Sequence, residues 1–328
     1  MHKRVTVKDV ARAAGVSQTT VSFVLNGVPD HRVPQNTQER VLRAARDLGY
    51  TPSKVAQALR LGRTDLVLLI LPAIPIGSIV TVLINTLTDE LEGLGLHLTT
   101  RRLQSNSSVS TLVQGLSPAA VISLDPFPEP DLEWLRSSGV VTIVLEDTRE
   151  GTAARPGGNE RVGAMQVQHL VARGHRHLGY ALPRDLLLQT YANPRLDGAR
   201  HACLSLGLDQ PVVVDLDLDV DSAVRAVQQL RQHEPPITAV CVYNDDYAFA
   251  ILAGLRALHL VAPDDLAVIG CDNVPLAPLA CPPLTTIDLN MPIMAANLAR
   301  SISVALTGNA VSAPTITENI TLRVRDSA

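Results

Sequence analysis

Hydroxyl and amide side chains gather on one side of the helix predicted for residues 18–25. Because an α-helix turns by about 100° per residue, Gln18, Thr19, Ser22 and Phe23 fall on one arc and mostly aliphatic residues on the other. Amide and hydroxyl groups match the hydrogen-bonding groups of base edges and phosphates in a DNA major groove. The segment therefore predicts contact with duplex DNA. Phe23 would either touch a thymine methyl group or fold back onto the core of its own domain.

A second group of polar residues comes after predicted strands in the larger part of the chain. Asn244 and Asp272 end two such strands, and Arg195 is predicted at the start of a helix facing the same cleft. Ligands of parallel α/β sheets bind outside the carboxyl ends of the strands, and one guanidinium with two acceptors suits a polyhydroxylated molecule. Taken alone, however, Asn244 and its neighbour Asp245 are more often helix caps, and Arg195 is more often a surface ion pair.

Enzyme chemistry has little support in the sequence. The motifs GxGxxG after a strand, GxxxxGK[ST], HExxH and GxSxG are all missing. His175 and His177, two apart on a strand edge, make a poor metal site, so no metal and no cofactor are predicted. The four cysteines share no CxxC spacing and are predicted to be reduced core residues.

The elements that must position the first polar group are three short helices near the N-terminus. Thr6 and Asp9 have the spacing of a capping box, and Gly15 suits the left-handed residue that ends a helix. Ser17 can cap the next helix after a three-residue turn. The third helix is predicted for residues 35–48. Its expected inward residues are Val41, Leu42, Ala45 and Leu48.

A short conditional helix is predicted after these three. Pro52 blocks continuation from upstream, Ser53 can cap residues 54–61, and Gly62 follows. Isolated helices shorter than about 12–15 residues are marginal in water. The segment should therefore be frayed until a partner orders it.

From residue 66 onward, β-rich runs alternate with helical stretches, which predicts parallel sheets with helices on both faces. The predicted strands are 66–71, 96–103, 119–124, 140–146, 177–182, 212–216, 238–244 and 266–272, and helices include 79–94, 161–173, 194–206 and 247–258. Eight such units divide naturally into two lobes. We expect lobe one at about 65–160 and 290–316, and lobe two at about 161–289 and 317–328.

Charge is distributed unevenly along the 328 residues. Residues 1–64 hold eleven Lys/Arg and four Asp/Glu (+7), and the remainder hold 17 and 28 (−11). A basic head on an acidic body favours a polyanion as the partner of the head. The longest aliphatic run, residues 66–71, is far below the roughly 18 residues of a membrane span, and the start lacks a secretory signal. A cytoplasmic location and no membrane partner are expected.

Several motifs together resemble the lac repressor (LacI/GalR) family of bacterial regulators. In the head they are VTVKDVA at 5–11, AGVS at 14–17, TVS at 20–22, VLNG at 24–27 and GYTP at 49–52. In the body they are GHR at 174–176, RLxG at 195–198, ND at 244–245, GCDN at 270–273 and PPLTTI at 282–287.

The resemblance implies a helix-turn-helix DNA-binding domain (1–50), a hinge helix or linker (51–64) and an effector-binding domain (65–328). That last domain would be a periplasmic-binding-protein-like α/β body of two doubly wound parallel-sheet lobes. It also implies a homodimeric repressor on a near-palindromic operator, with an effector such as a sugar at Arg195, Asn244 and Asp272. The residues expected at DNA are Thr6, Ser17, Gln18, Thr19, Ser22, Phe23, Asn26, Lys54, Val55, Ala56 and Leu59.

Leu59 matches the hinge leucine that the family inserts into the minor groove, and such a wedge unstacks a base step. A plain linker whose Leu59 packs on the core is the alternative.

Some residues depart from the family pattern. Phe23 stands where Arg is commonest, residues 72–77 read PAIPIG where the first strand usually leads into an aromatic turn, and Cys271 replaces an aromatic residue. These departures leave two alternatives to a stacked sugar: a different kind of effector, or a vestigial pocket. A solute-binding transport protein and an enzyme with a DNA-binding head are the other classes that the fold would allow.

Overall fold

The computed structural model describes residues 5–26, 33–50, 62–71, 74, 76–102, 108–124, 127–144, 158–307 and 320–328. The predictions for Lys54, Val55, Ala56 and Leu59, and for the side chain of Asn26, lie outside the described residues. The chain forms two compact units, Met1–Asp65 and Leu66–Ala328, which we call the head and the body.

The head contains α1 (Val7–Ala14), α2 (Gln18–Asn26) and α3 (Gln35–Asp47). Asp9 Oδ2 accepts hydrogen bonds from the Thr6 backbone nitrogen at 3.0 Å and from Thr6 Oγ1 at 2.7 Å. Gly15 ends α1 with a left-handed φ of 64°. Ser17 Oγ accepts a hydrogen bond from the Thr20 backbone nitrogen at 3.0 Å. The predicted start and end of α1 and the cap of α2 are thus confirmed.

Small residues make the core of the head, which corrects one prediction. The buried side chains are Val10, Ala11, Ala14, Val21, Val41, Ala44 and Ala45. Leu42 and Leu48 were expected inside but are 44% and 38% exposed. Leu42 lies about 100° around the helix from Val41, and Leu48 is the C-cap residue beyond the last turn of α3. Ala44, on the same side as Val41, takes the inward position instead.

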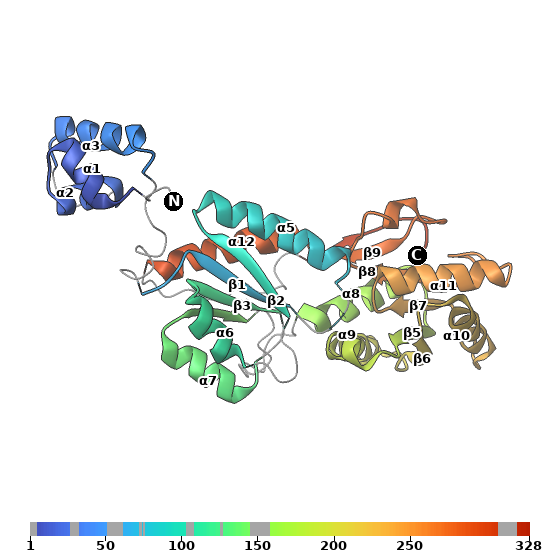
Figure 1. The fold of residues 1–328 in the computed structure, drawn as a ribbon. Helices are drawn as coiled ribbons and strands as arrows, with labels where there is room; N and C mark the ends of the chain where they lie inside the picture. Colours follow the sequence, from blue (N-terminus) through green and yellow to red (C-terminus); the bar gives the residue numbers. More distant parts are fainter. Residues whose placement is uncertain are drawn as a thin grey trace. The chain divides into compact units, whose positions relative to one another are not determined.

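The first lobe of the body is built on a parallel sheet with strand order β2-β1-β3-β4. Its strands are β1 (Leu66–Leu71), β2 (His97–Arg102), β3 (Ala120–Ser123) and β4 (Val141–Val144). Its helices are α5 (Ser78–Gly93), α6 (Val109–Leu116), α7 (Glu129–Ser138) and α12 (Met291–Leu306). Alternate residues of β1 point to opposite faces, so Leu69 packs toward α5 and α12 while Leu68 packs toward α6 and α7. Figure 1 shows α5 and α12 side by side over this sheet.

The second lobe has a six-stranded sheet in the order β10-β9-β8-β7-β5-β6, with only β10 antiparallel to its neighbour. Its strands are β5 (Leu178–Pro183), β6 (Val212–Leu216), β7 (Ala239–Val242), β8 (Ala267–Cys271), β9 (Thr285–Asp288) and β10 (Thr321–Arg323). Helices α8 (Gly158–Ala172) and α9 (Leu186–Ser205) pack on one face, and α10 (Val220–Gln232) and α11 (Asp245–Ala257) pack on the other. The two-lobed α/β body is as predicted, although β9 and β10 were not foreseen.

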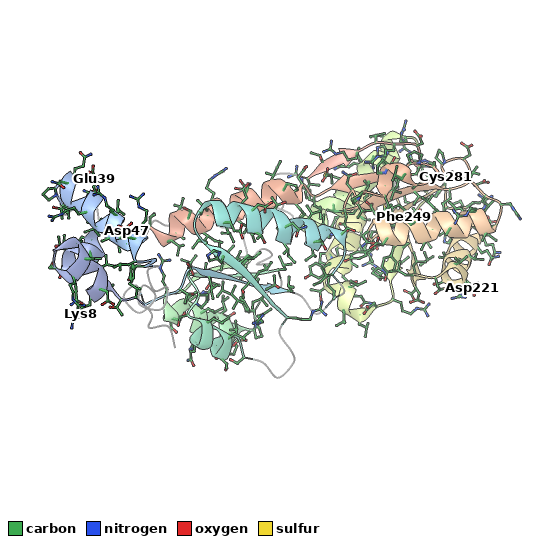
Figure 2. The ribbon with its side chains drawn as sticks, turned by 45° about the horizontal axis from the view of Figure 1, so that its top comes forward. Lys8, Glu39, Asp47, Asp221, Phe249 and Cys281 are labelled. Atoms are coloured by element: carbon green, nitrogen blue, oxygen red, sulfur yellow. The ribbon has the colours of Figure 1, made fainter. Side chains whose placement is uncertain are left out.

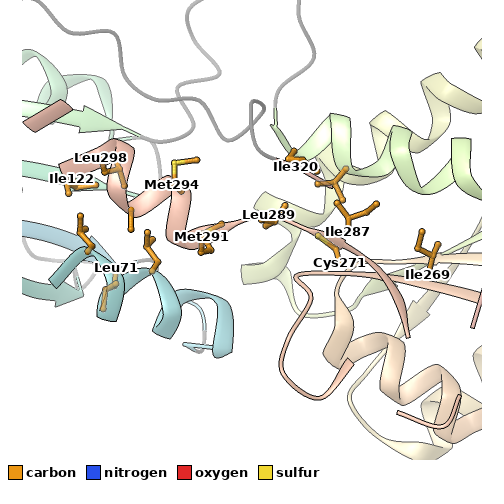
Figure 3. Close-up of a cluster of buried hydrophobic side chains, with 14 of the residues drawn as sticks. Leu71, Ile122, Ile269, Cys271, Ile287, Leu289, Met291, Met294, Leu298 and Ile320 are labelled. Carbon is orange, nitrogen blue, oxygen red and sulfur yellow. The ribbon is translucent and has the colours of Figure 1, made fainter. Parts of the chain in front are cut away.

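One apolar core continues from one lobe into the other. Leu289, Met291 and Met294 belong to the same buried cluster as Leu71 of the first lobe and Ile269 of the second. In Figure 3 Leu289, Met291 and Met294 follow one another along the chain that leads from β9 into α12, which we call the crossing segment, with Leu71 on one side of them and Ile269 on the other. The segment therefore connects the two lobes through buried packing as well as through the chain.

Candidate functional site

The surface of α2 carries the side chains predicted to face DNA. Gln18 and Thr19 are exposed, Ser22 and Phe23 are partly exposed, and Val21 is fully buried. The polar arc thus lies outward and the aliphatic arc inward. Phe23, at intermediate exposure, is compatible with both readings of its role.

Two of the predicted DNA contacts also act within the head. The side chains of Thr6 and Ser17 take part in the capping of α1 and α2, and Ser17 Oγ lies 2.8 Å from Thr20 Oγ1. Hydroxyls can serve more than one partner. In Figure 2, Lys8 of α1 and Glu39 of α3 point away from the head's core.

The body holds a cavity of about 360 Å³ at the carboxyl ends of β7 and β8. Arg195, Asn244 and Asp272, the three residues predicted to face an effector, all line it. Polar neighbours that were not predicted are Asn159, Tyr191, Asp246 and Tyr247. The structure therefore brings the predicted triad together and adds several residues to it.

A close approach of α8 and α9 positions Arg195. A Cβ at Gly163 would lie 1.8 Å from the Arg195 carbonyl oxygen, and a Cβ at Gly198 would lie 1.8 Å from the Glu160 carbonyl oxygen. Only glycine permits this backbone contact. It places Arg195 directly beside Asn159, the second residue of α8.

Two predictions for Arg195 are wrong. One placed it at the start of a helix, and the other, from its residue type alone, placed it in an ion pair on the surface. Asp185 Oδ1 accepts a hydrogen bond from the Leu187 nitrogen, so α9 begins at Leu186 and continues through Pro194. Arg195 therefore lies in mid-helix and is 6% exposed. The predicted boundary at 194 came from the proline, which α9 accommodates internally.

The guanidinium of Arg195 is held from three sides. Its Nε donates to Asn159 Oδ1 at 2.7 Å, and one terminal nitrogen donates to the Tyr243 carbonyl oxygen at 2.7 Å. The same nitrogen is 3.9 Å from Asp272 Oδ1, and the group lies 4.9 Å from the centre of the Tyr243 ring. Burial lowers the pKa of Arg195, but Cys271 and Asp272 raise it, and the net pKa lies above its ordinary value. Arg195 is thus a fixed cation.

Asp272 has an unusual backbone and an unsatisfied oxygen. Its φ is 110°, a conformation that side-chain-bearing residues rarely adopt, and strain of this kind concentrates at functional sites. The side chain is 8% exposed, and within the described part of the chain Oδ1 is buried with no hydrogen-bond partner. Burial raises the pKa of Asp272 to about 6, although Arg195 lowers it.

Asn244 caps a helix, as its residue type predicted, and it also lines the cavity. Its Oδ1 accepts a hydrogen bond from the Tyr247 nitrogen at 3.1 Å, which caps α11. Its side chain also lowers the pKa of Asp272. The cap orients the amide for the pocket.

Gln166 is a further positioning residue that the sequence analysis missed. Its Nε2 donates to the carbonyl oxygens of Val242 at 2.9 Å and Gly270 at 3.0 Å. These contacts fix α8 against the carboxyl ends of β7 and β8, from which Asn244 and Asp272 follow. A buried Gln inside an otherwise apolar helical stripe was the available signal.

Of the cysteines, Cys203, Cys241 and Cys271 are buried as predicted, and burial raises the pKa of each thiol. Cys281 is exposed, which corrects the prediction of four core cysteines. Figure 2 shows it on the second lobe. Among the described residues no cluster of three or more His, Cys, Asp or Glu could hold a metal ion. Nor does any described helix have the length and apolarity to cross a membrane.

The chain combines a three-helix head, whose α2 has a polar surface, with a two-lobed body that has a cavity at its strand ends. This combination is typical of ligand-responsive transcription regulators. The profile "Bacterial regulatory proteins, lacI family" matches residues 6–53, and "Periplasmic binding protein-like domain" matches residues 167–328. The Ribose operon repressor of Escherichia coli (strain K12) is 30% identical over 300 residues, covering 86% of this chain and 87% of the relative. The chain belongs to the LacI family.

Two solved structures share the architecture. The transcriptional regulator CelR–cellobiose complex is 27% identical with a TM-score of 0.66, covering 99% of this chain and 100% of that one. The Lac repressor dimer bound to operator and the anti-inducer ONPF is 22% identical with a TM-score of 0.78, covering 99% of each chain; this second likeness concerns the fold. The protein is a DNA-binding transcription regulator and not an enzyme.

Proposed function

We propose that this regulator represses transcription as a homodimer on a near-palindromic operator, with one head on each half-site. Gln18, Thr19, Ser22 and Phe23 would read base edges. Thr6, Ser17 and Asn26 would contact the DNA around them. The outward polar arc of α2, opposite the buried Val21, supports this assignment. The proposed location is the cytoplasm, where operator DNA is accessible.

We further propose that residues 51–64 form a hinge between a head of residues 1–50 and an effector-binding domain of residues 65–328. Lys54, Val55 and Ala56 would approach the DNA, and Leu59 would enter the minor groove. A segment this short needs a partner to become helical. Its helix–coil equilibrium would then respond to the arrangement of the two lobes.

The proposed effector is a sugar or a sugar-like molecule held by Arg195, Asn244 and Asp272. One observation carries this assignment: the three residues converge on a cavity that side chains of both lobes line. A ligand there would contact both lobes and favour one arrangement of them, which shifts the population between DNA-binding states. The relatives named for the ribose operon and for a cellobiose complex support a sugar.

The DNA-reading proposal is tested by recovering bound fragments from genomic DNA with the purified protein and measuring affinity by fluorescence anisotropy. Gln18→Ala should weaken binding to the recovered site by about ten- to hundredfold, with a much smaller loss on random duplex. Gln228→Ala, an exposed glutamine of α10, serves as the control. Equal losses on both duplexes would remove Gln18 from base reading.

The effector proposal is tested by calorimetric titration of the full chain with neutral sugars and nucleosides. The binder should lose about ten- to hundredfold in affinity on Asp272→Asn, because a hydrogen bond to a charged group contributes about 1.5–3 kcal/mol. Asp221→Asn, on the exposed surface of α10 in Figure 2, is the matched control. Full affinity in Asp272→Asn would place the ligand elsewhere, and no binding by any compound would indicate a vestigial pocket.

A further inference from the structure

Two neighbouring residues at the end of β8 contact different parts of the body. Asp272 lines the cavity, whereas Asn273 is partly buried and lies outside the cavity lining. Both have a positive φ, of 110° and 52° respectively. Residues with a side chain rarely adopt such values, and strained backbone persists only where the surrounding contacts hold it. The contacts of Asn273 therefore help to hold the loop that presents Asp272.

The side chain of Asn273 joins this loop to two other segments. Its Nδ2 donates a hydrogen bond to Asp288 Oδ2 at 3.0 Å, and its Oδ1 accepts one from Arg325 Nη2 at 2.6 Å. A carboxylate can only accept and a guanidinium can only donate, so the side chain between them has to do both. An amide meets this requirement. An aspartate of the same shape would instead bring two carboxylates into contact.

Asp288 is the residue at which β9 ends and the crossing segment begins, and its side chain is 14% exposed. Its Oδ1 accepts a hydrogen bond from the Asn290 nitrogen at 2.8 Å. Its Oδ2 accepts one from Arg323 Nε at 3.0 Å, in addition to the one from Asn273. Asn290 turns the chain with a φ of 49° and is the N-cap residue of α12. These contacts attach the start of the crossing segment to the second lobe.

The same short stretch also reaches the cavity. Leu289 and Met291, on either side of Asn290, line the cavity and belong to the apolar cluster that continues between the lobes (Figure 3). Met291 is the first residue of α12, which packs with α5 of the first lobe. The chain is thus held to the second lobe up to Asn290 and belongs to the first lobe from Met291 onward. A rotation of one lobe against the other bends the chain at this boundary.

We propose that Asn273, Asp288 and Arg323 form a clamp that couples the cavity to the arrangement of the two lobes. A ligand that contacts Asp272 displaces its loop, Asn273 passes the displacement to Asp288, and the bend at Asn290 changes. Asn273 is thus a positioning residue, which acts through Asp288 and does not contact the ligand. This inference rests on the proposed effector role of the cavity and adds the residues that transmit binding.

Hydrogen exchange of the full chain tests the clamp without any ligand. Asn273→Asp keeps the shape of the side chain but removes the donor to Asp288, so the Asn290 amide should exchange about ten- to hundredfold faster. Adding Asp288→Asn reverses donor and acceptor and should restore most of the protection. Asn85→Asp, at an exposed position of α5, is the control. Equal exchange in the wild type and in Asn273→Asp would overturn the clamp.

A second variant keeps the test decisive if Asn273→Asp does not fold. Arg323→Gln changes a side chain that is 50% exposed and removes its charge from Asp288. The exchange of the Asn290 amide should then rise by roughly two- to fivefold. In that case unchanged exchange in Arg323→Gln would overturn the clamp.

The coupling to DNA is measured by fluorescence anisotropy on the recovered operator fragment, with ribose, cellobiose and every compound that binds in the calorimetric titration. Asn273→Asp should bind the same compound as tightly as the wild type, because Asn273 does not line the cavity. The change in operator affinity that the compound causes should become about two- to thirtyfold smaller. An unchanged response, or an equal loss of compound binding, would overturn the coupling role of Asn273. If the wild type binds no compound, the effector proposal fails, while the exchange of the Asn290 amide still decides whether the clamp exists.

Discussion

Asp245 Oδ1 accepts a hydrogen bond from Thr286 Oγ1 at 2.5 Å, and both side chains are fully buried. Its other oxygen accepts a hydrogen bond from the Val274 nitrogen at 2.9 Å. A Cβ at Gly270 would lie 2.3 Å from Oδ1, so glycine at that position makes room for the carboxyl group. Asp245 thus links the start of α11 to β9 and to the loop that follows Asp272.

This buried carboxyl group predicts a pH dependence of stability. Burial raises the pKa of Asp245 to about 7, against the lowering effect of the Thr286 hydrogen bond. The unfolded value is about 3.9, so the folded state binds the proton more tightly. The stabilisation is complete below about pH 4 and is lost as the pH rises through 7.

Asp245→Asn should therefore flatten the fall in the free energy of unfolding between pH 5 and pH 8, by an amount on the order of a few kcal/mol. Urea unfolding at several pH values measures it. Asp264→Asn, at an exposed position, controls for general charge effects. Parallel curves for the wild type and Asp245→Asn would contradict the prediction.

Gly198→Ala should destabilise the body by about 3 kcal/mol, because overpacking of this kind costs about 1–3 kcal/mol and the added Cβ would meet backbone rather than a flexible side chain. Differential scanning calorimetry measures the loss. Gly115→Ala in α6, where a Cβ would meet nothing within 4 Å, should be neutral or slightly stabilising. Similar melting temperatures for the two variants would refute the close contact of α8 and α9.

Ser17→Ala should lower the stability of the head by about 1 kcal/mol through loss of the α2 cap. Amide hydrogen exchange at Thr20, whose nitrogen donates to Ser17 Oγ, should become faster. Ser17→Asn retains a capping oxygen and should restore protection. Restored protection together with weak DNA binding would assign Ser17 a direct DNA contact, whereas unchanged exchange in Ser17→Ala would argue against the cap.

Leu59→Ala should weaken binding to the operator and reduce the bend that the protein introduces, because an inserted side chain supports the kink. Gel mobility of circularly permuted fragments measures the bend. Lys8→Ala, at an exposed residue of α1, should leave the bend angle unchanged. A bend of equal size in Leu59→Ala would favour a plain linker.

Local sequence patterns predicted most of the helices and strands. The strand at 66–71 has the predicted bounds because its six residues form a continuous apolar run, which is typical of a parallel strand buried on both faces. β9 and β10 escaped prediction because Thr285, Thr286 and Thr321 interrupt their apolar pattern. The threonines of β9 are satisfied by partners far along the chain, such as Asp245 and Ser327.

Three residues of the candidate site could be predicted from the sequence, but its other members and the way it is built could not. Arg195, Asn244 and Asp272 stand out by type and place, whereas the partner of Arg195, Asn159, is 36 residues away in the sequence. The close helix contact at Gly198 and the backbone conformation of Asp272 are properties of packing that no periodicity reports. The aliphatic residues that line the cavity, such as Ile76 and Val80, were not predicted either, because apolar residues after a strand are expected in a core.

The apolar side chains that run without a break from Leu71 through Met294 to Ile269 have one more consequence. Unfolding of either lobe would therefore expose buried apolar side chains of the other lobe. We therefore expect heat to melt residues 66–328 in a single cooperative transition, with calorimetric and van't Hoff enthalpies that agree.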